Sequence, residues 1–179
     1  MFLSAAGATF ACGLEDPSSI GFQRGVLNMA FPEALHVGTA VWQAQAAGTL
    51  PRDALLQRDD LAPEARATLR LFKANALMGQ LAARLDDEQG RRANPHLAVV
   101  LIGPVLWTRF TVQNGKVVAS FHAPGPEPGD VVVVTEAAVV EAIVRGELTF
   151  ANALERRVAR LYGADETVAA VRQWLVAQH

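Results

Sequence analysis

The sequence predicts an α+β protein, in which a helical amino-terminal half precedes a mostly antiparallel five-stranded sheet covered by helices. In the first half, apolar residues recur at helical spacing. After Pro95, short runs rich in valine, threonine and aromatic residues replace them, and an Asn-Gly dipeptide separates two of these runs. We therefore expect a helical extension at 1–92 and an α+β domain at 93–179, packed as one compact unit.

Length and composition limit the possible classes of protein. A chain of 179 residues, 51% of them hydrophobic, suits one domain with a sizeable core. Its net charge of −2 gives no general attraction to nucleic acid or to an anionic membrane surface. Residues 1–13 are apolar and rich in small residues, like a signal peptide, but lack a basic region. We expect a buried segment of a cytoplasmic protein without a transmembrane segment; a cleaved segment is the alternative.

Three helices are predicted in the amino-terminal half. The first covers about 19–30, and the second covers about 33–47. Because apolar residues occupy most sides of the second helix, it is either buried within the fold or packed against another copy of the chain. A long helix follows over about 63–86, beginning at a proline, with Gly90 as its stop signal.

A β-hairpin is the clearest local feature of the second half, after a strand at 96–103. LWTRFTVQ and KVVASFH alternate in polarity, and Asn114 and Gly115 join them. Both residues tolerate the positive φ angles of a two-residue turn, which fixes the register of the strands. The predicted cross-strand pairs are Val112 with Val117, Phe110 with Ala119, and Thr108 with Phe121.

A run of four valines at 131–134 forms the next strand. No polar residue interrupts it, so we expect both of its faces to be covered. Thr135 is a candidate cap for a helix, and Thr149 for a shorter one. A last strand is predicted at 157–163, followed by a terminal helix that begins with Asp165 as its cap.

This order of elements resembles the sterol carrier protein type 2-like family over roughly residues 95–175. The resemblance depends on FTVQNGKVV, on PGDVVVVTEAAVVEAIVRGELTFANAL and on RVARLYGADETVAAVRQWL, at 110–118, 128–154 and 157–175. These segments match a hairpin, a buried strand, a helix ending in a GEL-like turn, and a strand ending in glycine. The chain departs from the family at Glu155-Arg156, where a glycine is usual before the last strand.

The resemblance implies a sheet with helices on one face and an apolar cavity for a lipid-like molecule between them. An apolar cavity binds by removing ligand surface from water, at about 0.8 kcal/mol per methylene buried. Each candidate side chain could equally be part of an ordinary dry core. The candidate ligand-binding residues are Val132, Val134, Val140, Ile143, Phe150, Leu154 and Trp174.

The sequence predicts no catalytic residue, no metal site and no cofactor. Its four histidines fall on separate segments without ligand spacing, and it has no nucleophile-elbow or phosphate-loop motif. Glu141 could face a cavity mouth, although a solvated helix face explains it as well. Arg156, Arg157 and Arg160 form the densest basic group, which could meet a phosphate or an anionic head group, or simply face solvent.

Two classes of function follow. The first is non-catalytic binding or carriage of a hydrophobic small molecule or lipid of the fatty-acyl or sterol-like kind. The second is a homo-oligomeric interaction or scaffold protein with a solid core, which forms a homodimer through its apolar amino-terminal helices. An enzyme is a third and weaker alternative, because it would need a histidine–carboxylate or serine–base contact inside a cleft. Nucleic acid is not an expected partner.

Overall fold

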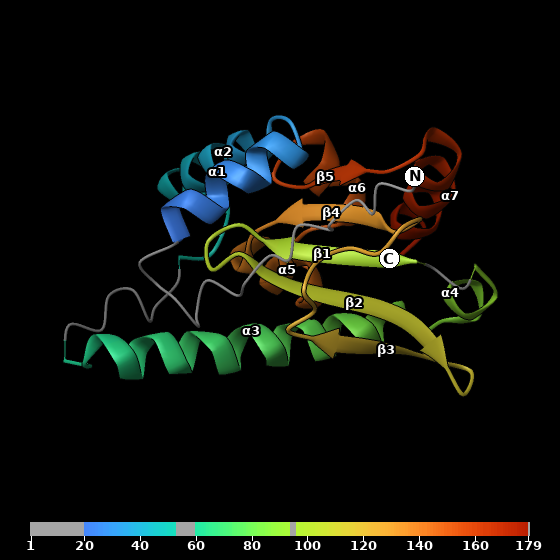
Figure 1. The fold of residues 1–179 in the computed structure, drawn as a ribbon, viewed down its shortest axis with the longest axis horizontal. Coiled ribbons are helices and arrows are strands. Elements are labelled where there is room, and N and C mark those ends of the chain that lie inside the picture. The colour runs from blue at the N-terminus through green and yellow to red at the C-terminus, as the bar shows by residue number, and fades with distance from the viewer. Residues whose placement is uncertain (1–19, 53–59, 94–95, 179) are drawn as a thin grey trace, which may run out of the picture.

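The computed structural model describes residues 20–52, 60–93 and 96–178, and it confirms the α+β class (Figure 1). The predictions for residues 1–13 fall outside the described residues. The helices are α1 Ile20–Ala30, α2 Ala34–Ala46, α3 Pro63–Leu85, α4 Glu88–Ala93, α5 Ala137–Val144, α6 Phe150–Glu155 and α7 Asp165–Val176. The strands are β1 Leu97–Leu101, β2 Leu106–Gln113, β3 Lys116–Phe121, β4 Val131–Thr135 and β5 Arg160–Tyr162.

The five strands form one sheet in the order β3-β2-β1-β4-β5. Three of the four pairings are antiparallel, whereas β1 and β4 run parallel, so the sheet is mixed. The parallel pair arises because the loop after β3 carries the chain past β2 to the far side of β1. The predicted hairpin register is confirmed, with Val112 opposite Val117 and Phe110 opposite Ala119.

Strand β4 lies between β1 and β5, and all five of its residues are buried, as the uninterrupted valine run predicts. Val133 and Thr135 face a layer that contains α3, α5, α6 and α7. Because neighbouring side chains in a strand point to opposite faces, Val132 and Val134 face the layer of α1 and α2. On that side Phe31, between α1 and α2, contacts the ring of Trp107 on β2.

The ends of the later elements differ in part from the predictions. Thr135 belongs to β4, and its hydroxyl donates to the Val158 carbonyl at 3.0 Å, so Glu136 precedes α5 instead. Thr149 caps α6 as expected, accepting the Asn152 N–H at 3.2 Å. Asp165 is the first residue of α7 rather than its cap. The last strand is also shorter than predicted, three residues long.

Gly90 does not end the long helix. Helix α3 ends at Leu85, and Gly90 lies inside the separate short helix α4. A Cβ at Gly90 would lie 2.4 Å from the Leu85 carbonyl oxygen and 2.9 Å from Cζ2 of Trp174. Glycine therefore lets α4 pack closely against both the end of α3 and helix α7.

Asp87 joins the same three helices. Its carboxylate accepts hydrogen bonds from Gln178 at 2.7 Å, from the Gly90 N–H and from the Trp174 indole at 3.5 Å. Burial opposes ionisation of this carboxyl, but the hydrogen bonds outweigh it and lower the pKa of Asp87 below its usual 3.8.

None of the described helices is long and apolar enough to cross a membrane.

Candidate functional site

Three of the seven candidate residues, Val140, Ile143 and Phe150, line one cavity between the sheet and its helices. The cavity holds about 10 Å³, which is about the space of a single water molecule. Among the described residues that line it, Thr135 alone is polar, and its hydroxyl is already bonded to Val158. This inner cavity, as we call it, is completed by Leu81, Leu85, Leu97, Val99, Val133, Thr135, Ala159 and Leu175.

The other four candidates lie elsewhere. Val132 and Val134 point to the opposite face of the sheet, because β4 alternates. Trp174 is 1% exposed and packs between α7 and α4, where its indole N–H reaches Asp87. Leu154 lines an open polar groove beside β5. The seven candidates therefore divide among four environments.

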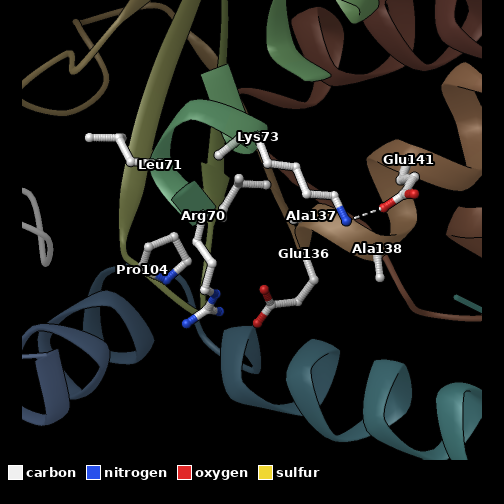
Figure 2. Close-up of a pocket in the computed structure, with 10 residues that line it drawn as sticks. Arg70, Leu71, Lys73, Pro104, Glu136, Ala137, Ala138 and Glu141 are labelled. Carbon is white, nitrogen blue, oxygen red and sulfur yellow. Dashed lines mark ion pairs between the residues drawn. The ribbon is translucent and has the colours of Figure 1, made fainter. Parts of the chain in front are cut away.

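A second cavity, of about 60 Å³, opens between α3 and α5 at the end of β1. We call it the mouth. Its walls are apolar at Leu71, Ala74 and Leu101, and its rim is charged (Figure 2). The charged side chains of the rim are Arg70, Lys73, Glu136 and Glu141.

Glu141 faces this mouth rather than solvent. Its carboxylate forms an ion pair with Lys73 of α3 at 2.8 Å (Figure 2) and another with Arg145 at 2.6 Å. Its side chain is only 12% exposed, so the pair with Lys73 is partly shielded from water. The ion pair thus holds α3 against α5 across the opening.

Glu136 forms the other side of the rim. Its carboxylate accepts the Gly103 N–H from the turn between β1 and β2, and the Arg70 side chain extends into the same space (Figure 2). Burial raises the pKa of Glu136 above its ordinary value of 4.5, although the charges of Arg24 and Arg70 oppose that shift.

The turn between β1 and β2 also contains Val105, a buried β-branched residue at φ 48°. Such strain is often found at functional sites.

Replacing Glu136 with glutamine is expected to stabilise the protein at neutral pH. A raised carboxyl pKa means that Glu136 contributes stability below pH 4.5, and that this contribution is lost as pH rises through the folded-state pKa. The neutral amide avoids that loss. Urea unfolding should show a more stable variant at about pH 7.5 and no difference below about pH 4.5. Glu147→Gln, at an exposed position, is the control. An unchanged or less stable Glu136→Gln variant at pH 7.5 would contradict the expectation.

The mouth and the inner cavity lie along one seam. Leu97, Val99 and Leu101 alternate onto the same face of β1, and they pass from the inner cavity to the mouth. Helix α3 lines both spaces, from Ala74 at the mouth to Leu85 at the inner cavity, a distance of about 16 Å at 1.5 Å per residue. Helix α5 borders both as well. The seam is charged at one end and apolar at the other.

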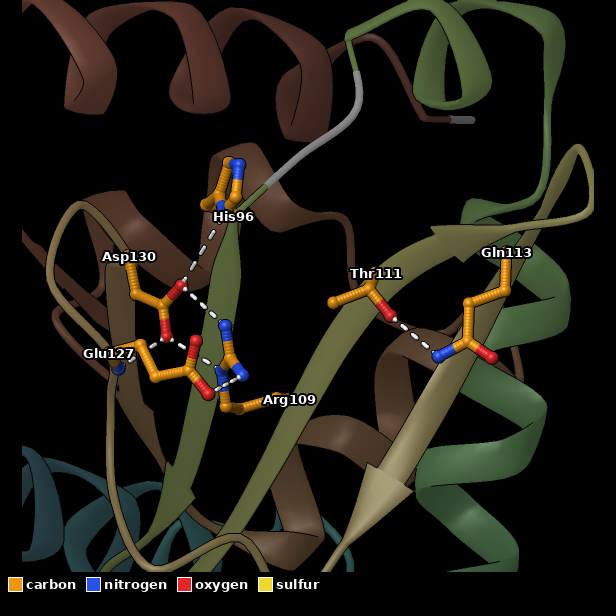
Figure 3. Close-up of polar contacts among 6 residues, drawn as sticks. All are labelled: His96, Arg109, Thr111, Gln113, Glu127 and Asp130. Atoms are coloured by element: carbon orange, nitrogen blue, oxygen red, sulfur yellow. Dashed lines mark hydrogen bonds and ion pairs between the residues drawn. The ribbon is translucent and has the colours of Figure 1, made fainter.

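A cluster of charged side chains, separate from the two cavities, fixes the proline-rich loop at 122–130, between β3 and β4, to the opposite face of the sheet (Figure 3). Asp130 is fully buried at its side chain and binds Arg109 at 2.9 and 3.2 Å, while Arg109 also pairs with Glu127. The Asp130 carboxylate accepts the Glu127 N–H at 2.7 Å. His96 lies 3.9 Å from the same carboxylate, but its side chain is 65% exposed, so this contact lies at the surface rather than in a cleft.

The sequence gives little indication of the charged rim. Arg70 and Lys73 are polar residues on an amphipathic helix, which is the ordinary pattern of a solvated face. Only Glu141, within an otherwise apolar helix, signals an unusual environment. Within the part of the chain that the structure describes, no three His, Cys, Asp or Glu side chains are grouped so that they could hold a metal ion.

No protein-family model matches the chain, and no curated protein matches it. Among solved structures, the chain is similar to the stereoselective inverting sec-alkylsulfatase Pisa1 from Pseudomonas sp.. The two are 19% identical over 53% of this chain and 14% of that one, with a TM-score of 0.41. The match therefore spans a small part of the alkylsulfatase, and at this score it carries no argument about function.

Proposed function

We propose that the protein binds a hydrophobic small molecule, of the fatty-acyl or sterol-like kind, without transforming it. The ligand's apolar body would lie along the seam between α3 and α5, and its polar end would lie at the mouth. The observation that carries this proposal is the polarity of the seam. Charged side chains surround one end, and the eleven described residues that surround the other have a single, internally bonded hydroxyl among them.

The length of the seam suits such a ligand. The distance of about 16 Å along α3 is on the scale of a long acyl chain. Each methylene that leaves water for this environment would contribute about 0.8 kcal/mol. At the mouth, Arg70 and Lys73 offer positive charge to an anionic or polar head group, in exchange for their contacts within the protein.

Binding requires the seam to open, because the two cavities are smaller than the ligand. Helix α3 is the element suited to move. Every buried residue of α3 lies at or after Ala74, while Leu69 and Phe72 in its first half are 42% and 65% exposed. The first half of α3 also extends past the sheet (Figure 1). Displacing this first half would therefore cost little packing and would widen the mouth once the Lys73–Glu141 ion pair breaks, whereas the inner cavity enlarges only if the buried half of α3 also shifts.

Filling the mouth should block binding. Ala138 of α5 is half-buried in its wall, so Ala138→Trp is expected to weaken the binding of a fluorescent fatty acid at least about tenfold, or 1.4 kcal/mol. Ala151→Trp, on α6 and similarly half-buried, is the matched control and should bind like the unmodified protein. Equal affinities for both variants, with circular dichroism showing that both are folded, would show that the mouth is not part of the ligand-binding site.

Assembly through α1 and α2 is a second candidate function, favoured by a different observation. Phe22, Met29 and Trp42 are 77%, 84% and 68% exposed on these helices. Large exposed apolar side chains that share one surface are typical of protein interfaces. If this surface forms a homodimer, sedimentation velocity at micromolar concentration should show a dimer, and Trp42→Glu should convert it to a monomer. A monomer at every concentration would contradict assembly without affecting the ligand proposal.

A further inference from the structure

An open groove of about 470 Å³ lies between the α1–α2 turn and the segment from α6 to α7, apart from the seam. Three arginines from separate elements line it: Arg157 after α6, Arg160 on β5 and Arg172 on α7. Among the described residues of its lining, Glu33 is the one carboxylate, and it pairs with Arg160. Three positive charges less one negative charge leave the lining at +2.

Two residues of the groove adopt left-handed backbone conformations. Arg157 has φ 58° and Glu33 has φ 68°. Arg157 follows Arg156, the C-cap of α6; its N–H bonds the Leu154 carbonyl at 3.1 Å, and the next N–H bonds the Ala153 carbonyl. Glycine is the usual residue at this position of a helix end, because it adopts positive φ without strain. An arginine here places a guanidinium at the groove despite that strain, which points to a role for the side chain.

Arg160 supplies an independent sign of a missing partner. Its Nε is buried, and among the described residues it has no hydrogen-bond acceptor, although its Nη2 pairs with Glu33. A buried donor without an acceptor is unfavourable in a folded protein. The wall beside it is fixed, because the Tyr162 hydroxyl donates to the Pro32 carbonyl at 2.6 Å and the Tyr162 ring contacts Phe31. Because the Arg160 side chain is 27% exposed, a change of its rotamer would let the Nε donate to a ligand oxygen in the groove.

We propose that this arginine groove, lined by Arg157, Arg160 and Arg172, binds a phosphate group. A phosphate monoester carries about −1.5 to −2 charge, which matches the +2 of the lining. Its three free oxygens can accept from three guanidinium groups, whereas a carboxylate has only two oxygens. Leu154 and Leu161 provide apolar surface for the remainder of the molecule. The phosphate belongs either to a soluble phosphate ester or to a lipid head group, and the test separates the two.

The test measures binding at low ionic strength in two arms. Calorimetry with glycerol 3-phosphate reports a soluble ester, and flotation with phosphatidylcholine vesicles, with and without phosphatidic acid, reports a lipid. Binding in either arm, weakened at least about tenfold by Arg157→Gln, is the expected result. Arg156→Gln removes the same charge from the neighbouring arginine, which bonds Thr49 outside the groove lining, and should leave binding unchanged.

A second variant, Arg157→Gly, distinguishes a loss of phosphate binding from a loss of folding. It removes the guanidinium and relieves the left-handed strain, so it should lose phosphate binding while the midpoint of thermal unfolding rises by about 2 °C. The proposal is overturned if neither arm shows binding. It is also overturned if Arg156→Gln weakens binding as much as Arg157→Gln, because the effect would then be one of general charge.

Discussion

Replacing Asp130 with alanine is expected to lower the free energy of unfolding by about 3–5 kcal/mol. The Asp130 side chain is completely buried and makes both a bidentate ion pair with Arg109 and a hydrogen bond to the Glu127 N–H. Alanine would leave Arg109, whose side chain is only 15% exposed, with Glu127 as its one remaining ion-pair partner among the described residues. It would also release the loop between β3 and β4. Urea unfolding monitored by tryptophan fluorescence measures the loss.

Two further variants distinguish the contribution of the buried Arg109–Asp130 ion pair from that of the exposed residue Glu127. Glu127→Ala removes only the 65% exposed partner and should cost less than about 1 kcal/mol. Arg109→Met combined with Asp130→Leu removes both charges at once and should restore most of the stability that Asp130→Ala loses. A loss below 1 kcal/mol for Asp130→Ala would show that the cluster does not hold the loop.

Trp174→Ala should produce a loss of similar size, about 3–5 kcal/mol. The indole is 1% exposed, contacts Gly90 of α4 and donates to Asp87, so its removal leaves a cavity where three helices meet. Trp174→Phe keeps most of the ring and loses the N–H, and it should cost about 1 kcal/mol. The midpoint of chemical unfolding compares the three proteins.

The same variants test the role that the sequence suggests for Trp174. Because the side chain lies outside both the mouth and the inner cavity, Trp174→Phe is expected to bind a fluorescent fatty acid with unchanged affinity. A marked loss of affinity in this folded variant would show that Trp174 contributes to the ligand-binding site.

Much of the fold could be predicted because local chemistry determines it. The Asn114-Gly115 turn requires two positive φ angles, and the alternation of the flanking strands then leaves one register, which is the one observed. Four consecutive valines likewise predict burial on both faces of β4. The parallel pairing of β1 with β4 depends on how the long loop crosses the sheet, which no local pattern records.

The candidate site was harder to predict than the fold. Consecutive valines show that both faces of β4 are covered, but not which face has the charged mouth; the structure places Val133, rather than Val132 and Val134, beside the inner cavity. Arg70 and Lys73 look like ordinary solvated residues of an amphipathic helix. Their position at the rim follows only from the packing of α3 on α5. Gly90 similarly resembles a helix stop, although its role is to permit close contact between helices.

Native mass spectrometry of the freshly purified protein, before and after incubation with an excess of a long-chain fatty acid, tests the central proposal most directly. Ligand binding along the seam predicts a species heavier than the polypeptide by the mass of one hydrophobic molecule, and Ala138→Trp should reduce its abundance. A single mass equal to that of the bare polypeptide, both before and after incubation, would contradict ligand binding.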